Sequence, residues 1–193
     1  MKIMVINPNS SKHMTHHLDE VLQAIKGPDT ELTVCCPENG PMAIESAYDE
    51  AMCLPGLLPL VQQAEKDGYD AVILACFSDP GLEQARELVN ILVCGIQEVA
   101  VHVAAMMGAK FSILTLNAER VPSKEKDIYR YKVERGLASV RPIGLSVAES
   151  DENPDLARAK IKAVAKTCAE QDGAEVVVLG CAGMAGYAED VKK

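Results

Sequence analysis

The chain has 193 residues, of which 48% are hydrophobic, with no tryptophan and only two phenylalanines. A core of aliphatic side chains favours layered α/β packing over an aromatic-rich β sandwich. The formal net charge is −9, and the one basic cluster, Lys124–Lys126 with Arg130 to Arg135, also carries acidic residues, which argues against a nucleic-acid partner. No apolar run approaches the length of a membrane span or of a secretory signal, so we expect a soluble, cytoplasmic protein without a membrane partner.

Strand-like and helix-like segments alternate along the chain. Apolar runs rich in valine and isoleucine predict strands buried on both faces of a parallel sheet. The predicted strands are Lys2–Ile6, Glu31–Cys36, Ala71–Ala75, Phe111–Leu116, Arg141–Ser146 and Val176–Gly180. The predicted helices are Met14–Lys26, Gly56–Asp67, Gly81–Ile91, Ile96–Met107 and Asn153–Asp172. This alternation indicates right-handed crossovers between parallel strands.

The two halves of the sequence resemble each other. Ala64–Cys76 and Ala169–Cys181 are identical at seven of thirteen positions, and each predicts a helix end, an Asp-Gly stop, a buried strand and then a cysteine. Lys2–Asn9 matches Lys110–Asn117 more weakly. We therefore predict an α/β fold of two pseudo-symmetric, Rossmann-like parallel-sheet lobes with the site in the cleft between them. The lobes are residues 1–95, completed by the carboxyl-terminal end of the chain, and residues 96–193.

Seven cysteines are present, with no Cys-x-x-Cys pair and no cysteine or histidine at zinc-ligand spacing. We therefore expect neither a disulfide framework nor a metal site. The sequence also has no glycine-rich loop of the dinucleotide-binding type, so we expect no cofactor. Five of the cysteines are interpreted as inert thiols packed in the core. These are Cys35, Cys36, Cys53, Cys94 and Cys168.

Cys76 and Cys181 differ from the others because each follows a predicted strand at its carboxyl end, where open parallel sheets bind ligands. Asp79 and Pro80 predict a helix start just after Cys76, and the helix dipole would lower the pKa of this thiol. Two opposed thiols suit racemisation next to a carbonyl, since one removes a proton from one face while the other protonates the opposite face. The alternative is that both are inert core thiols, but the matched pair favours catalysis.

Backbone N–H groups of the two cysteine loops would face the same site and bind a carboxylate, an enolate oxygen or an imide carbonyl. These groups belong to Phe77, Ser78, Ala182 and Gly183.

Four motifs resemble those of the aspartate/glutamate/hydantoin racemase superfamily, and most closely its hydantoin and allantoin racemase branch. They are Ile6–Ser11, Ala75–Leu82, Gly95–Glu98 and Leu179–Met184. The resemblance implies a racemase that needs neither metal nor pyridoxal, acts on a small-molecule substrate and forms a homo-oligomer. It also implies that Cys76 and Cys181 are the catalytic acid/base pair.

The same resemblance implies that Asn9 lines the substrate pocket and that Thr115 corresponds to the first residue of a threonine pair. The second residue of that pair is Leu116 here, which removes one polar group. Family members continue beyond the second cysteine segment into a further strand and a closing helix, whereas this sequence ends at Lys193. We therefore expect the first lobe to lack a covering element.

Other activities remain open at this point. An aspartate or glutamate racemase would need threonine-rich loops to hold a free amino acid, and a decarboxylase would be expected to have a single cysteine. A maleate-type isomerase or a non-catalytic thiol-redox protein with this fold are further alternatives. The sequence leaves the roles of Glu98, His102 and the cluster His13, His16 and His17 undecided.

Overall fold

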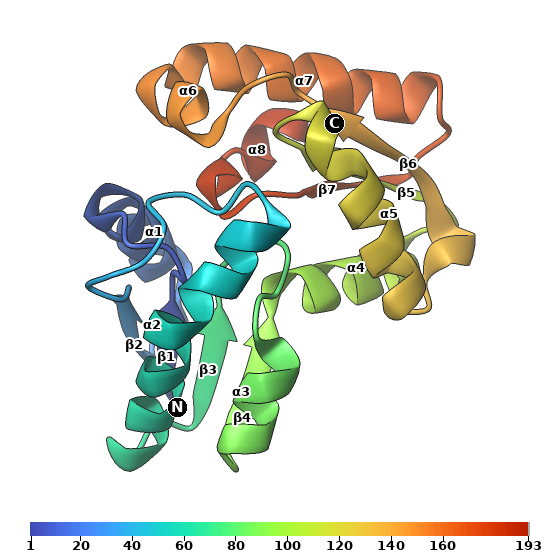
Figure 1. Ribbon diagram of the computed structural model, residues 1–193. Coiled ribbons are helices and arrows are strands. Elements are labelled where there is room, and N and C mark those ends of the chain that lie inside the picture. Colours follow the sequence, from blue (N-terminus) through green and yellow to red (C-terminus); the bar gives the residue numbers. More distant parts are fainter. Residues whose placement is uncertain (193) are drawn as a thin grey trace. The chain divides into compact units, whose positions relative to one another are not determined.

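Parallel sheets form the centre of both halves of the chain (Figure 1). The computed structural model describes residues 1–192, and the chain divides into two units, Met1–Ile96 and Gln97–Lys193. Each unit has the α/β architecture predicted from the sequence. No helix in the described part of the chain is both long and apolar enough to span a bilayer.

The first unit contains a four-stranded parallel sheet in the order β2-β1-β3-β4. Its strands are β1 (Lys2–Ile6), β2 (Glu31–Cys35), β3 (Ala71–Leu74) and β4 (Leu92–Gly95). Its helices are α1 (Lys12–Ile25), α2 (Ala47–Lys66) and α3 (Leu82–Leu88). Aliphatic side chains of α2, including Leu57 and Val61, pack with Ile6 and Leu74 of the sheet and are fully buried. This burial supplies the main driving force for folding of the unit.

The second unit contains a three-stranded parallel sheet in the order β6-β5-β7. Its strands are β5 (Phe111–Thr115), β6 (Leu137–Pro142) and β7 (Val176–Leu179). Its helices are α4 (Ile96–Met107), α5 (Val121–Arg130), α6 (Val147–Glu152), α7 (Pro154–Glu170) and α8 (Ala188–Val191). Short 3-10 turns are η1 (Ala118–Arg120), η2 (Glu134–Gly136) and η3 (Ala182–Met184). Leu114, Ile161 and Cys168 lie in the core where α7 covers the sheet.

The two sheets repeat the same central pairing. The paired rows are Ile3–Ile6 with Ala71–Leu74 in the first unit and Phe111–Leu114 with Val176–Leu179 in the second. One further hydrogen bond extends each row, from Ala75 N–H to the Ile6 carbonyl and from Gly180 N–H to the Leu114 carbonyl, both at 2.8 Å. The repeat in the sequence is therefore also a repeat in strand order, register and hydrogen bonding.

The predicted strand Arg141–Ser146 is wrong, because β6 spans Leu137–Pro142 and ends where the prediction begins. Ile143 and Leu145 are nevertheless buried, at 4% and 6% exposure. They belong to a loop that continues along the end of β5, with the Ile143 N–H donating to the Thr115 carbonyl at 2.8 Å. Because this loop is buried, its composition is as apolar as that of a buried strand, which explains the wrong prediction.

The predicted helix start at Gly56 is also wrong, because α2 begins nine residues earlier and contains Pro55 and Pro59. Ser46 caps the helix, and the Asp49 carboxylate accepts from the Ser46 N–H at 3.0 Å, which completes a capping box. The Ser46-x-x-Asp49 sequence is the signal for the true start, and the helix continues through both prolines. β4, α5, α6 and α8 were not predicted from the sequence.

A polar network ties β6 to the residues that follow α7. Arg141 donates to both carboxylate oxygens of Asp172, at 2.5 and 2.6 Å, and Ser139 Oγ donates to the same carboxylate at 2.6 Å. Ser139 Oγ also lies 2.8 Å from Ser112 Oγ of β5. Hydrogen bonds from Arg141 are the main reason that the pKa of Asp172 falls from 3.8 to about 2, against the opposing effect of burial.

We expect Asp172→Asn to lower the free energy of unfolding by about 1 kcal/mol at pH 7, since water partly screens the lost charge-assisted hydrogen bonds. Because the pKa is depressed in the folded state, the carboxylate stabilises the fold above pH 3.8 and loses this effect as the pH falls towards 2. Urea unfolding at pH 7 and pH 3 measures both effects. Glu170→Gln, at an exposed ion pair with Lys166, is the control. An equal decrease in the free energy of unfolding of Asp172→Asn and Glu170→Gln would contradict the prediction.

Candidate active site

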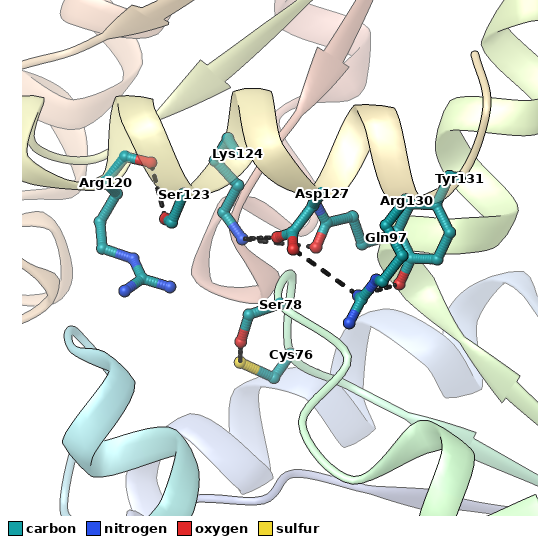
Figure 2. Close-up of polar contacts among 9 residues, drawn as sticks. All are labelled: Cys76, Ser78, Gln97, Arg120, Ser123, Lys124, Asp127, Arg130 and Tyr131. Atoms are coloured by element: carbon teal, nitrogen blue, oxygen red, sulfur yellow. Dashed lines mark hydrogen bonds and ion pairs between the residues drawn. The ribbon is translucent and has the colours of Figure 1, made fainter. Parts of the chain in front are cut away.

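The predicted site residues of the first unit lie beyond the carboxyl ends of β1 and β3. Cys76 is partly buried, two residues after β3, and its Sγ lies 3.5 Å from Ser78 Oγ (Figure 2). Phe77 and Ser78 are buried, at 5% and 8% exposure. Asn9 is 5% exposed and lies in the loop that follows β1. Asn9, Cys76 and Ser78 therefore lie at the same end of the four-stranded sheet, the carboxyl end of its strands, since β1 and β3 are adjacent and parallel.

The predicted site residues of the second unit lie at the corresponding edge of its own sheet. Thr115 is the last residue of β5 and is 2% exposed. Cys181 lies two residues after β7, is partly buried, and is followed by Ala182 and Gly183 in η3. Gly180 allows the chain to pass close to the end of β5. A Cβ at this position would lie 2.3 Å from the Leu114 carbonyl oxygen, which leaves no room for a side chain.

Each cysteine opens a turn of the same kind. The Asp79 N–H donates to the Cys76 carbonyl at 3.0 Å, and the Met184 N–H donates to the Cys181 carbonyl at 3.0 Å. The two thiols thus follow corresponding strands and open turns that are closed by the same hydrogen bond. Such a pair can supply one acid and one base of the same chemical type.

Three N–H groups of these turns are available to a ligand. Among residues 1–192, no oxygen or sulfur accepts a hydrogen bond from the backbone N–H of Ser78, Ala182 or Gly183. Backbone N–H groups of this kind can bind a carbonyl oxygen and stabilise it further as it gains negative charge.

Side chains of the Asn-Pro-Asn loop hold that loop in place. Asn7 Nδ2 donates to Asn9 Oδ1 at 2.8 Å and to Thr15 Oγ1 at 3.0 Å, and Asn9 Oδ1 also accepts from the Ser11 N–H at 2.9 Å. Asn9 Nδ2 lies 3.2 Å from the sulfur of Met14, which is a weak acceptor. The amide oxygen of Asn9 is therefore committed to the loop, while its amide nitrogen retains hydrogen-bonding capacity for a ligand.

The helix after Cys76 begins within one residue of the predicted start at Gly81, but the prediction that Asp79 caps it is wrong. Helix α3 begins at Leu82, with Gly81 in the left-handed region (φ 72°) at its N-cap and no side-chain cap. Asp79 lies before the helix and has φ 47°. Because α3 has only seven residues and starts six residues after Cys76, its dipole gives no reason to lower the pKa of this thiol. The Asp-Pro-Gly sequence forms turns instead, as these residue types favour.

Three other thiols, Cys35, Cys53 and Cys168, have raised pKa values, in each case mainly because of burial. Burial raises the pKa of Cys53 from 9.0 to about 12, with a further increase from the neighbouring Cys76 thiol. Burial, followed by the neighbouring Cys36 thiol, raises the pKa of Cys35 to about 11. Cys53 and Cys168 are buried, whereas Cys35, Cys36 and Cys94 are partly buried. Cys35 and Cys53 therefore keep their protons at neutral pH and are poor bases there.

A buried lysine that the sequence analysis did not identify lies on α5 (Figure 2). Lys124 is 3% exposed, and its Nζ lies 3.4 Å from Gln97 Oε1 and 3.7 Å from Asp127 Oδ2. Arg130 approaches the other oxygen of Asp127 at 3.7 Å. The i,i+3 spacing of Lys124 and Asp127 was a signal of this cluster.

The chain is similar in sequence and in structure to known racemases. The family model described as Asp/Glu/Hydantoin racemase matches residues 3–193. A hydantoin racemase of Rhizobium meliloti is 38% identical over 193 residues, which cover 100% of this chain and 80% of that protein. The allantoin racemase of Klebsiella pneumoniae is 34% identical, has a TM-score of 0.95, and is matched over 99% of this chain and 78% of that chain. The allantoin racemase of Pseudomonas fluorescens is 32% identical with a TM-score of 0.93, over 99% and 81% of the two chains.

Proposed function

We propose that this chain, which belongs to the Asp/Glu/hydantoin racemase family and is an isomerase of the racemase type, inverts C5 of 5-substituted hydantoins or of allantoin with Cys76 and Cys181. The observation that carries this proposal is the repeated strand and turn that gives each unit one cysteine at an equivalent position. Hydantoin and allantoin racemases among its relatives support a cyclic ureide as the substrate class.

The proposed reaction moves one proton at each face of C5. One cysteine, as the thiolate, removes the C5 proton, and the electrons pass into the adjacent carbonyl to give an enolate. The other cysteine, as the thiol, then donates its proton to the opposite face of C5. The thiols exchange roles for the opposite enantiomer. This scheme requires the two units to present Cys76 and Cys181 to opposite faces of one substrate.

Backbone N–H groups would stabilise the enolate oxygen. Those of Ser78, Ala182 and Gly183 have no acceptor among the described residues, so each can donate to a substrate oxygen without breaking a protein hydrogen bond. We propose that the backbone N–H of Phe77, which lies in the same turn as Ser78, also faces the substrate. Because backbone donors are fixed before the reaction begins, they need little reorganisation as the charge develops.

The proposed pocket suits a neutral ring better than a free amino acid. Asn9 would donate an amide hydrogen to a ring carbonyl, and the nearly buried hydroxyl of Thr115 would contact a ring N–H or carbonyl. Phe77 and Ala182 give the cysteine loops an apolar character that would not compensate the loss of water from a free ammonium group. We further propose that the chain acts in the cytoplasm as a homo-oligomer.

Proton exchange in deuterium oxide tests this proposal. Each pure enantiomer of a 5-substituted hydantoin and of allantoin is incubated with the full chain. NMR follows loss of the C5 proton, and circular dichroism follows loss of optical activity. Both signals should decay faster than in samples without protein. L-aspartate and L-glutamate, treated in the same way, should keep their α-protons. Exchange of the amino acids with none of the cyclic ureides would reject the proposed substrate class.

Removal of metal ions is expected to leave the rate unchanged within about twofold, because the thiols move the proton and the backbone N–H groups hold the oxyanion. The full chain is dialysed against EDTA, and a second sample is treated with hydroxylamine to remove any pyridoxal. Racemisation is measured before and after each treatment. Activity that is lost on dialysis and returns with added zinc would contradict the proposed mechanism.

A further inference from the structure

A buried carboxylate and a glycine lie against each other beside the Cys76 loop. Asp79 is 3% exposed, and a Cβ added to Gly95 would lie 2.3 Å from Asp79 Cγ and 2.5 Å from its Oδ1. The carboxylate therefore occupies the space that any side chain at position 95 would need. Gly95 ends β4 and pairs with Leu74 of β3. This contact thus joins the loop that carries Cys76 to the neighbouring strand.

Asp79 also has an unusual backbone conformation. Its φ of 47° lies in the left-handed region, which is disfavoured for residues other than glycine. Its N–H donates to the Cys76 carbonyl at 3.0 Å, and its carbonyl accepts from the Leu82 N–H at 3.2 Å. Asp79 is therefore the corner shared by two successive turns. Such a conformation persists where the surrounding structure enforces it, and the packing over Gly95 is one such constraint.

The equivalent turn of the second unit is held differently. Met184 occupies the position that corresponds to Asp79, and its N–H makes the equivalent hydrogen bond to the Cys181 carbonyl. Its side chain is 1% exposed and belongs to the apolar core that includes Leu114 and Ile161. An apolar anchor holds the Cys181 turn, whereas a carboxylate over a glycine holds the Cys76 turn. The two thiols can therefore be displaced separately.

We infer that Asp79 is a positioning residue for Cys76, because its carboxylate, packed over Gly95, fixes the turn that presents the thiol and the Ser78 N–H. The expected effect on catalysis rests on the proposed function, whereas the expected effect on the alkylation rate of Cys76 does not. Displacing the carboxylate moves Cys76 and leaves Cys181 in place.

A double-mutant cycle tests the contact in the full chain. Gly95→Ala forces the Asp79 carboxylate to move, and Asp79→Gly removes it while allowing the left-handed backbone without strain. Iodoacetamide labelling followed by mass spectrometry gives the alkylation rates of Cys76 and Cys181 in each variant. Gly95→Ala should change the Cys76 rate severalfold and leave the Cys181 rate unaltered. In the Asp79→Gly background, Gly95→Ala should have little further effect.

The control is Gly68→Ala in the same unit. Gly68 has φ 74°, and an added Cβ meets no atom within 4 Å, so this substitution strains the backbone before β3 without touching the Cys76 loop. Its ratio of the Cys76 rate to the Cys181 rate should equal that of the unaltered protein. If circular dichroism shows that Gly95→Ala does not fold, Asp79→Gly alone should still change the Cys76 rate and spare Cys181.

Exchange at C5 gives the catalytic readout. In Gly95→Ala, exchange of the enantiomer whose proton Cys76 removes should fall about 10²-fold, as expected for a misplacement of about 1 Å, while exchange of the other enantiomer persists. The inference would be overturned if Gly95→Ala changed the alkylation rates of Cys76 and Cys181 equally. It would also be overturned if Gly95→Ala changed the Cys76 rate equally in the presence and absence of the Asp79 side chain. If the unaltered protein exchanges no cyclic ureide, the proposed function fails, and the alkylation cycle still decides the role of Asp79.

Discussion

Cys76→Ala and Cys181→Ala should each lower the rate of racemisation by about 10³-fold or more, because inversion needs an acid on one face of C5 and a base on the other. Each variant should still exchange the C5 proton of one enantiomer with solvent, since the remaining thiolate can remove a proton and return a deuteron on the same face. The enantiomer that exchanges should differ between the two variants. NMR in deuterium oxide with each pure enantiomer measures this directly.

Cys168→Ala is the matched control for loss of a thiol. Cys168 is buried on α7, in the core of the second unit, and its pKa is raised mainly by burial. Its replacement should leave racemisation within about twofold of the unaltered rate, because this thiol has no part in the proposed mechanism. Cys76→Ala and Cys181→Ala variants that exchange the same enantiomer would contradict a mechanism with one base on each face.

The fold could be predicted from the sequence where the signals were local. The Asp-Gly stop, the aliphatic strand and the following cysteine appear in Ala64–Cys76 and again in Ala169–Cys181, and the structure gives both segments the same pairing with the central strand. Predictions failed where distant residues decide the outcome. The buried loop after β6 has the composition of a strand because other parts of the unit cover it, and α2 continues through Pro55 and Pro59.

In the candidate site, too, features with a local sequence signal could be predicted, whereas features that depend on distant residues could not. Position at a strand end is a local property, so the sequence sufficed to select Cys76 and Cys181 as candidates. The left-handed backbone of Asp79 and its packing over Gly95 involve residues sixteen positions apart, one in the loop after β3 and one at the end of β4. Burial of Lys124 depends on contacts with Gln97 at the start of α4. Neither feature has a periodic pattern, although a glycine at the end of a strand is itself a sign of a close approach.

Alkylation should distinguish the two proposed catalytic thiols from the thiols with raised pKa values. The thiolate is the reactive form, so a higher pKa lowers the reactive fraction at neutral pH. For Cys53, whose pKa rises from 9.0 to about 12, this fraction at pH 7.5 falls about 10³-fold, and for Cys35, with a pKa of about 11, it falls about 10²-fold. Burial slows Cys53 further by limiting access of the reagent.

We therefore expect iodoacetamide to modify Cys76 and Cys181 at pH 7.5 well before Cys53. The pH dependence gives a second test, because a thiol with a pKa of about 12 should react about tenfold faster for each pH unit from 7 to 10. Mass spectrometry of a labelling time course at several pH values measures these rates, and labelling in urea provides the unfolded reference. The structure removes the helix dipole as a reason for Cys76 to react first, so the order of Cys76 and Cys181 depends on their loops. Early labelling of Cys53, with Cys76 and Cys181 unmodified, would show that the reactive site lies elsewhere in the chain.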